Sequence, residues 1–328
     1  MKITDDVQGL KSLSQAIKQI KSEIGKVIVG QHDIIDQLLI AIFARGHVLL
    51  IGVPGLAKTL LIRTLAQALD LTFSRIQFTP DLMPGDITGT EVIEENISTK
   101  EKVFKFIKGP IFSNIVLADE INRTPPKTQS ALLQAMEEKE VTAAGNTYKL
   151  SQPFFVLSTQ NPIEQEGTYP LPEAQLDRFM FNIWLTYPSR DEEIEIVRTT
   201  TTEHIPEVNK ILNAEQIIEY QNLIRRIPVA DNVIKFAVDL VRETRPETTT
   251  LQIVKDYINY GAGPRGSQYL ILGAKSRAAF LGKFTPDIDD VRFVAVSVLR
   301  HRIVTNFNAE ADNLTAEKII QKVIEEIK

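Results

Sequence analysis

Residues 52–59, Gly-Val-Pro-Gly-Leu-Ala-Lys-Thr, constrain the fold of this chain more than any other segment. The apolar run 47–51 precedes them and predicts a buried strand, whereas the helical spacing of 58–69 follows them. A glycine-rich turn between a strand and a helix gathers backbone N–H groups at the helix N-terminus, where they can bind an anion. The segment therefore predicts an α/β fold with a phosphate-binding loop at the end of a strand.

The end of this loop carries the side chains that a nucleoside triphosphate needs. Lys58 supplies a cation for the β- and γ-phosphates, and the Thr59 hydroxyl can ligate Mg²⁺. The common pattern has glycine where Ala57 stands, and alanine costs little there if its φ is negative. Taken alone, the segment is also compatible with a glycine turn before an ordinary helix. We expect the phosphates to be surrounded by Gly52, Val53, Pro54, Gly55, Leu56, Ala57, Lys58, Thr59 and Leu60.

Two carboxylates follow a second apolar run, Ile115 to Ala118. A buried strand rarely ends in Asp119 and Glu120 unless these charges meet a cation. Asp119 can hold Mg²⁺ directly or through water, and Glu120 can act as general base for the attacking water. The acid pair alone is more often a solvated loop start. Together with the phosphate loop, in this order, it predicts ATP binding and hydrolysis with Mg²⁺.

The rest of the chain divides into two parts by its periodicity. Further strands are predicted at 72–78, 114–118, 154–159 and 180–185, with a helix at 127–138 and a hairpin at 141–150. Segment 79–110 is rich in Pro and Gly and predicts loops. Ser189 and Glu192 form a capping box, after which helical spacing continues almost to the end. We expect an α/β core with a parallel, helix-flanked sheet at 1–187 and a smaller all-helical domain at 188–328.

Composition excludes several classes of protein. The 328 residues include no cysteine, which excludes disulfides and thiolate chemistry, and the net charge of −5 does not favour nucleic-acid binding. His32, His47, His204 and His301 lack the spacing of zinc ligands, and we expect them to be structural or exposed. No signal peptide and no run of about 18 apolar residues is present. A cytoplasmic protein without a membrane span is expected.

Three further polar residues admit two interpretations each. Asn161 follows the strand 154–159 and can orient the attacking water, or it can be a turn residue before Pro162. Arg178 is more often a salt-bridged residue, but it can also be an arginine finger that reaches a neighbouring subunit. Arg265 stands where a loop enters a helix, which is unfavourable for the helix dipole and hints at an external anion.

These residues together resemble the AAA+ ATPases, specifically the MoxR family, over essentially the whole chain. In that family alanine is usual at position 57, whereas Gly263 and Gly266 replace small residues that carry a Cβ. The matching segments are Gly52–Thr59, Asp119–Arg123, Gln134–Glu138, Thr159–Pro162, Leu171–Phe179, Gly261–Ser267 and Val298–Arg302.

The resemblance implies a role for each matched residue and a P-loop NTPase core with a helical lid. One site would take charge from the core, the small domain and a neighbouring subunit. Segments 79–110 and 141–150 are similar to the helix-2 insert and the pre-sensor-1 hairpin. The implied site consists of Val29 and Gly30 at the adenine, Lys58 and Thr59 in Walker A, Asp119 and Glu120 in Walker B, Asn161 as sensor 1, Arg178 as arginine finger and Arg265 as sensor 2.

The resemblance also implies a chaperone-like motor that remodels or matures a partner complex. Members form homo-oligomeric rings, here expected as a hexamer that can require nucleotide. They often work with proteins that carry a von Willebrand factor A domain, in complex maturation or metal-cofactor insertion. Two alternatives are a nucleotide-gated scaffold with little turnover and a nucleic-acid motor; the acidic charge weighs against the second.

Two residues near the acid pair suggest control of hydrolysis. Gln77 is polar near the end of the second strand and can hydrogen-bond Glu120, or it can simply cap that strand end. Arg123 follows the acid pair, and either a subunit interface or a local salt bridge accounts for it.

Overall fold

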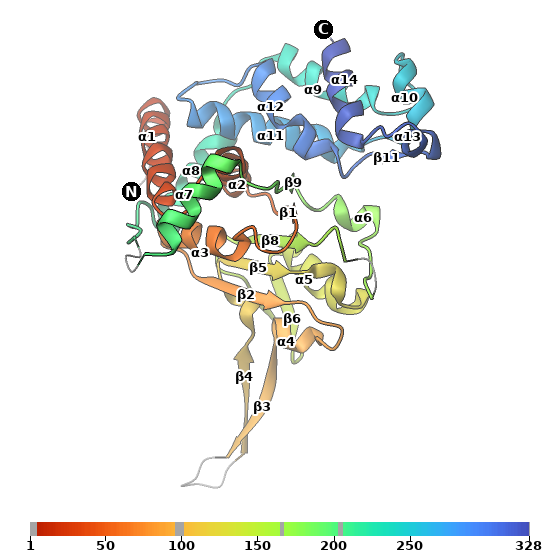
Figure 1. Cartoon of the computed structure of the whole chain (residues 1–328). Helices are drawn as coiled ribbons and strands as arrows, with labels where there is room; N and C mark the ends of the chain where they lie inside the picture. The colour runs from red at the N-terminus through yellow and green to blue at the C-terminus, as the bar shows by residue number, and fades with distance from the viewer. Residues whose placement is uncertain (1–4, 96–101, 165–166, 203–205, 328) are drawn as a thin grey trace.

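The structure, a computed structural model, describes residues 5–95, 102–164, 167–202 and 206–327. A five-stranded sheet forms the centre of the α/β part, with parallel strands in the order β2-β5-β8-β1-β9 (Figure 1). This confirms the predicted parallel sheet. Its strands are β1 Val48–Ile51, β2 Phe73–Gln77, β5 Ile115–Asp119, β8 Phe155–Gln160 and β9 Phe181–Trp184.

Side chains of the sheet alternate between two apolar cores. Leu50, Leu117 and Leu157 face one core, while Leu49 and Val116 face the other. Both faces are covered, which explains why β1 and β5 and the first half of β8 are continuous apolar runs. The first core is covered by α1 Asp6–Gly25, α2 His32–Phe43 and α3 Lys58–Ala68 together with C-terminal helices, and the second by α5 Pro126–Glu138.

After β9 the chain becomes mainly helical. The capping box of Ser189 and Glu192 is confirmed at the start of the first helix, and two short strands form the exception to an all-helical lid. The first core continues into these helices, so the predicted parts 1–187 and 188–328 share apolar contacts. None of the helices within the described residues is long and apolar enough to span a bilayer. The elements are α7 Arg190–Thr200, α8 Ala214–Arg226, α9 Asp231–Glu243, α10 Gln252–Tyr257, β10 Ile258–Tyr260, α11 Pro264–Phe280, α12 Ile288–Leu299, β11 Val304–Thr305, α13 Phe307–Ala311 and α14 Ala316–Glu326.

The segment 79–110, which was predicted as loops, instead contains a short helix and a β-hairpin. After α4 Pro84–Thr88, the antiparallel strands β3 Gly89–Glu95 and β4 Lys102–Lys108 form a hairpin that projects away from the body (Figure 1). The Pro and Gly residues that suggested loops lie mostly at its base. At Gly89 a Cβ would lie 2.2 Å from the Ile107 carbonyl oxygen, so the base of the hairpin requires glycine.

The hairpin predicted at 141–150 is confirmed as β6 Glu140–Ala143 and β7 Asn146–Lys149. Its turn is Ala144-Gly145, with φ of 50° and 74°, one residue before the predicted centre. The rings of Phe106 and Tyr148 stack with centroids 4.5 Å apart and join the two hairpins. The remaining short elements are η1 Pro110–Phe112, η2 Ile121–Arg123 and α6 Glu173–Leu176.

His47 connects three elements at the start of β1. Its Nε2 lies 3.1 Å from the Met136 carbonyl oxygen of α5, and its Nδ1 accepts the Val156 N–H of β8 at 3.0 Å. Burial lowers the pKa of His47 from its ordinary value to about 4, so the ring is neutral in the folded protein. The prediction that this histidine is structural is therefore confirmed.

The folded state should lose stability as the pH falls below the unfolded pKa of histidine. Between about pH 7.5 and pH 5 the unfolded chain binds a proton at His47 that the folded chain excludes, which costs about 2 kcal/mol of unfolding free energy. Urea unfolding at both pH values measures this loss. His47→Gln should be less stable at pH 7.5 but show a smaller loss on acidification. An equal loss in the variant and the wild type would contradict the assignment.

Candidate nucleotide site

The phosphate loop joins β1 to α3 as predicted. Its N-terminal end is tied to the sheet by the Gly52 N–H, which donates to the Gln160 carbonyl at 3.2 Å. Pro54 and Gly55 are exposed, and no atom lies within 4 Å of a Cβ placed on Gly55. Ala57 precedes α3 with a φ of 53°, so the negative φ that would make alanine inexpensive is not present. A left-handed alanine costs roughly 1–2 kcal/mol, and such strain is typical of binding sites.

Lys58 lies at the end of this loop with its side chain folded back. Its Nζ donates to the Gly52 carbonyl oxygen at 2.6 Å. Partial burial lowers the pKa of Lys58, while the charges of Asp119 and Glu120 oppose this shift. The Thr59 hydroxyl has no hydrogen-bond partner among the described residues, and Leu56 is buried beneath the loop. Leu60 is 42% exposed and points out of the helix, although we predicted it among the residues around the phosphates.

Asp119 lies at the end of β5 in contact with a cation that sequence analysis missed. Arg75 of β2 donates to Asp119 Oδ2 from Nη2 at 2.6 Å and from Nε at 3.1 Å. The Thr159 hydroxyl donates to Asp119 Oδ1 at 2.5 Å and accepts the Glu120 N–H at 2.9 Å. Arg75 stands two residues before Gln77 and on the same face of β2. The sequence signal from which this contact could have been predicted is a charged residue within a half-buried strand.

Glu120 has a left-handed φ of 57° and is held by two side chains. Gln77 Nε2 donates to Glu120 Oε2 at 2.9 Å, which confirms the predicted contact. Arg123 Nη1 approaches the same oxygen at 3.1 Å, so within one chain Arg123 forms a local salt bridge. Arg75 also donates to Gln77 Oε1 at 2.6 Å. One chain of polar contacts therefore connects both carboxylates with β2.

Asn161 follows β8, which lies between β5 and β1 in the sheet. This order places it between the acid pair and the phosphate loop. Its Oδ1 accepts the Ile163 N–H at 3.1 Å, so Asn161 is a turn residue, which is one of its two predicted roles. The side-chain amide remains available to donate to a ligand, and the two predicted roles are therefore compatible.

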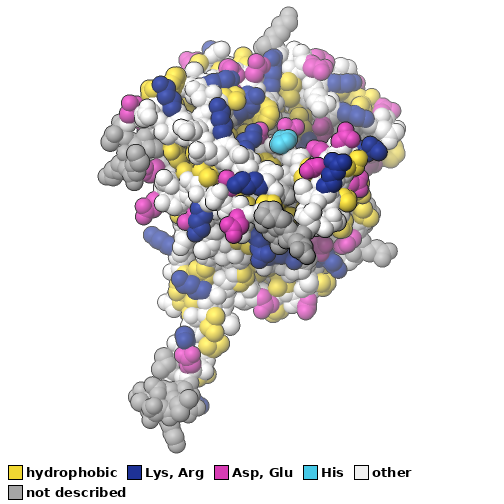
Figure 2. Space-filling model, turned by 60° about the vertical axis from the view of Figure 1, so that its left-hand side comes forward, with side chains coloured by type: hydrophobic (Ala, Val, Ile, Leu, Met, Phe, Trp, Pro, Cys, Tyr) yellow, Lys and Arg dark blue, Asp and Glu magenta, His cyan; other side chains and the backbone are white. Residues whose placement is uncertain are grey.

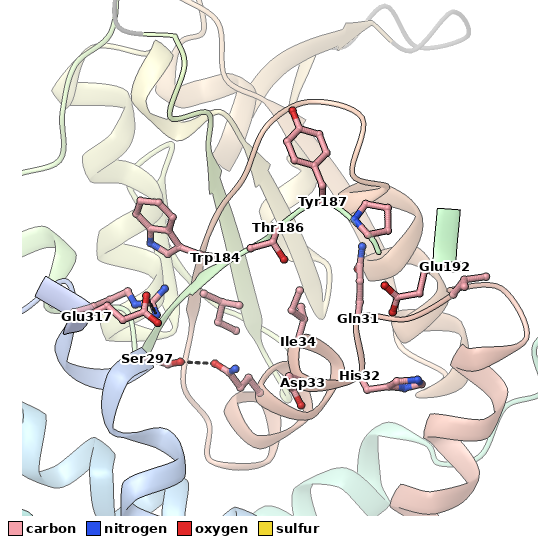
Figure 3. A pocket seen from close by; sticks show the side chains of 15 residues that line it. Gln31, His32, Asp33, Ile34, Trp184, Thr186, Tyr187, Glu192, Ser297 and Glu317 are labelled. Atoms are coloured by element: carbon pink, nitrogen blue, oxygen red, sulfur yellow. Dashed lines mark hydrogen bonds and ion pairs between the residues drawn. The ribbon is translucent and has the colours of Figure 1, made fainter. Parts of the chain in front are cut away.

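A cavity of about 530 Å³ is lined by the end of β9, the segment that follows it and the start of α2 (Figure 3). Trp184, on its wall, pairs in register with Ile51, the residue before the loop, and the next residue, Leu185, donates its N–H to the Ile51 carbonyl at 2.8 Å. The predicted adenine residue Val29 lines the cavity. Gly30 follows it with a φ of 66°, a conformation that favours glycine. The volume suits the adenosine part of a nucleotide.

These residues fit ATP with Mg²⁺. Lys58 and the loop would hold the phosphates, and Thr59 and Asp119 would hold the ion. Within the described residues no cluster of three acidic or histidine side chains forms a metal site by itself. The ion would therefore depend on oxygens of the nucleotide.

Arg178 and Arg265 lie together, away from the phosphate loop. Both pair with Glu137, at 3.1 Å and 3.4 Å respectively, and Arg265 also lies 3.4 Å from Asp177. Arg178 precedes β9, whose first residue pairs with the first residue of β1, whereas the loop follows the last residue of β1. The two arginines therefore lie at the opposite edge of the sheet from Lys58. This differs from the expectation that Arg265 joins Lys58 within one subunit.

The segment around Arg178 is held by Arg302, which received no role from the sequence. Its side chain is 1% exposed and donates to Asp177 Oδ1 at 2.8 Å and to the Phe179 carbonyl at 2.6 Å. His301, half-buried, also contacts that carbonyl at 3.0 Å. Of the other histidines, His32 is exposed and His204 lies outside the described residues.

Gly263 and Gly266, where the chain departs from the family pattern, do not distort the start of α11. A Cβ on Gly263 would have no neighbour within 4 Å, and one on Gly266 would make contacts of 3.4 Å. Neither glycine has a positive φ. A residue with a Cβ would therefore leave Arg265 in the same place.

Comparisons with known proteins agree with this geometry. Residues 47–181 match the ATPase family associated with various cellular activities (AAA), and residues 250–323 match the AAA lid domain. Chaperone MoxR1 of Mycobacterium tuberculosis is 41% identical over 322 residues, which are 98% of this chain and 84% of that protein. Protein MoxR of Methylorubrum extorquens is 30% identical over 300 residues, 88% and 87% of the two chains.

A solved structure supports the same assignment. The crystal structure of a Cytophaga hutchinsonii protein assigned as an ATPase is similar with a TM-score of 0.91 and 44% identity, and the match covers 98% of this chain and 97% of that one. These similarities extend over the sheet, the phosphate loop, the acid pair and the C-terminal helices. The chain belongs to the MoxR family of AAA+ ATPases.

Proposed function

We propose that this protein hydrolyses ATP with Mg²⁺ and uses the energy to remodel a partner protein complex. The observation that carries the proposal is the placement of Lys58, Glu120 and Asn161 at the ends of the adjacent strands β1, β5 and β8. A cation for phosphate, a general base and an amide to orient water are thereby available at one edge of the sheet. A nucleotide-gated scaffold, the alternative function, needs neither Glu120 nor Asn161.

Different residues of the chain have separate roles in the proposed hydrolysis. The backbone of 52–59 and Lys58 bind and orient the phosphates, and Glu120 accepts the proton of the attacking water that Asn161 holds in line. Mg²⁺, when bound, neutralises charge on the β- and γ-phosphates. Gln77 and Arg123 hold the Glu120 carboxylate. We propose that hydrolysis begins when this contact breaks, because both donors occupy Oε2 of the carboxylate that must accept the proton.

Arg178 and Arg265 act together on the nucleotide of a neighbouring subunit. They line a cavity of about 190 Å³ with Arg45 and Lys139, and Glu137 is the single acidic residue of this lining. Four cations around one carboxylate favour an added anion. Since the cavity lies at the edge opposite Lys58, a head-to-tail ring would place it against the next subunit's γ-phosphate. We therefore propose a homo-oligomeric ring, as a hexamer that can require nucleotide.

The client is proposed to be a protein. The projecting hairpin exposes Ile93, Phe104 and Ile107, by 59%, 65% and 51%, and apolar side chains favour protein contacts over phosphates. On the face in Figure 2, basic and acidic side chains are interspersed, with no uniformly basic surface. The name Chaperone MoxR1 of a relative supports a chaperone role. A partner with a von Willebrand factor A domain, metal-cofactor insertion and a cytoplasmic location remain predictions.

Lys58→Ala tests the nucleotide site. Loss of the buried cation should weaken ATP binding by at least about tenfold, because a charged hydrogen bond contributes roughly 1.5–3 kcal/mol. Isothermal titration calorimetry with ATP and Mg²⁺ measures the affinity. Lys235→Ala on α9 is the control and should bind as the wild type does. Unchanged affinity in Lys58→Ala would refute the phosphate-loop assignment.

Glu120→Gln separates binding from turnover. The variant should bind ATP with wild-type affinity but lose at least about a hundredfold in phosphate release, because a carboxamide cannot accept the proton. A coupled phosphate assay measures the rate, and affinity purification of the ATP-bound variant with mass spectrometry identifies trapped partners. Hydrolysis at the wild-type rate would remove Glu120 as the base.

Mixed rings test the action of Arg178 and Arg265 across subunits. Arg265→Ala and Lys58→Ala should each be inactive alone, whereas an equal mixture should restore activity at about a quarter of the sites, because one chain supplies the loop and its neighbour the arginine. Arg178→Ala should behave in the same way. If Arg265 acts within its own subunit, its mixture with Lys58→Ala stays inactive, which would contradict this proposal.

A further inference from the structure

We propose that Arg300 binds the adenosine part of the ATP held by its own subunit. The inference rests on the proposed function, because it assigns a further binding residue to the same nucleotide. Arg300 is the C-cap residue of α12 and lines the cavity at the end of β9, together with Trp184, Ser297 and Glu317 (Figure 3).

The guanidinium of Arg300 is largely buried but has few partners. Its side chain is 12% exposed, and among the described residues its one hydrogen-bond partner is Glu317, with Nη2 to Oε2 at 2.9 Å. The Nε–H is buried without a hydrogen-bond acceptor. A guanidinium has five N–H donors, and native structures rarely leave a buried one unsatisfied. A ligand in the adjoining cavity would supply the missing acceptor.

The position of Trp184 indicates which part of the nucleotide reaches Arg300. The indole is 53% exposed at the last position of β9, and the Arg300 guanidinium lies over its ring at 5.9 Å. Trp184 pairs in register with Ile51, one residue before the phosphate loop. A base that extends from phosphates on the loop would therefore lie near the indole and its cation. Adenine ring nitrogens and ribose hydroxyls are acceptors for Arg300, and the indole offers a face for stacking.

This contact would connect the C-terminal helices to the nucleotide of their own subunit. Arg265 cannot make that connection, because it lies with Arg178 at the other edge of the sheet. α12 is already joined to α2 through the hydrogen bond between Ser297 and Gln37, both of which line the same cavity. A ligand in contact with both Trp184 and Arg300 would add a further link between α12 and the core.

The test compares Arg300→Met with a matched arginine of the same helix. Arg292 pairs with Asp289 and lies over the Phe236 ring at 5.4 Å, so Arg292→Met removes a similar ion pair and ring contact away from the cavity. Titration calorimetry with ATP, ADP and inorganic tripolyphosphate measures each affinity. We expect Arg300→Met to weaken ATP and ADP by roughly tenfold each, the effect of losing one charged hydrogen bond. Tripolyphosphate binding should be unchanged, and Arg292→Met should match the wild type.

The tripolyphosphate titration and urea unfolding of Arg300→Met separate nucleotide binding from a purely structural role. A structural role would lower the stability and weaken tripolyphosphate together with ATP, whereas a contact with adenosine weakens ATP and ADP alone. A parallel loss of tripolyphosphate binding or unchanged ATP binding in Arg300→Met would overturn the proposal. A wild-type protein that binds no ATP would overturn the proposed function as well, whereas normal wild-type binding confines a failure to Arg300.

Discussion

Two carboxylates at the end of a buried strand are the constraint on which this structure depends. Asp119 and Glu120 follow four fully buried residues of β5, and charges in such a place require compensation. Arg75 and the Thr159 hydroxyl satisfy Asp119, while Gln77 and Arg123 satisfy Glu120. The compensating side chains come from β2, β8 and η2. The acid pair thereby joins β2 and β8, the two strands beside β5, with the short helix η2 at the point where ATP is proposed to react.

The parallel sheet separates two sets of cations because its edges differ. All carboxyl ends of the strands meet at one edge, which carries Lys58 and the acid pair. The start of β9 lies at the other edge, where Glu137 pairs with both Arg178 and Arg265. Arg302 holds the backbone on both sides of Arg178. The sheet therefore keeps Arg178 away from the phosphate loop of its own chain. This geometry supports the proposed assembly independently of the family resemblance.

Much of the fold was predictable because its signals are local. The strands β1 and β5 and the first half of β8 are apolar runs, and the helices that follow show helical spacing or a capping box such as Ser189 with Glu192. The β3–β4 hairpin was not predictable in the same way. Its strands are exposed and alternate weakly, and the glycines at its base resemble those of loops. The left-handed φ of Ala57 was likewise not predictable from the sequence, because the loop imposes that conformation where it joins α3.

By itself the sequence determined the residues proposed to meet ATP at the phosphate loop and acid pair, because their spacing along a strand–loop–helix segment is a local property. The contact of Gln77 with Glu120 also followed, since both residues end neighbouring parallel strands. Only the tertiary structure decided that Arg75 neutralises Asp119, that Arg265 lies beside Arg178, and that Arg300 faces Trp184. Each of these contacts joins residues more than 40 positions apart, and their meeting depends on strand order and helix packing, which no local spacing encodes.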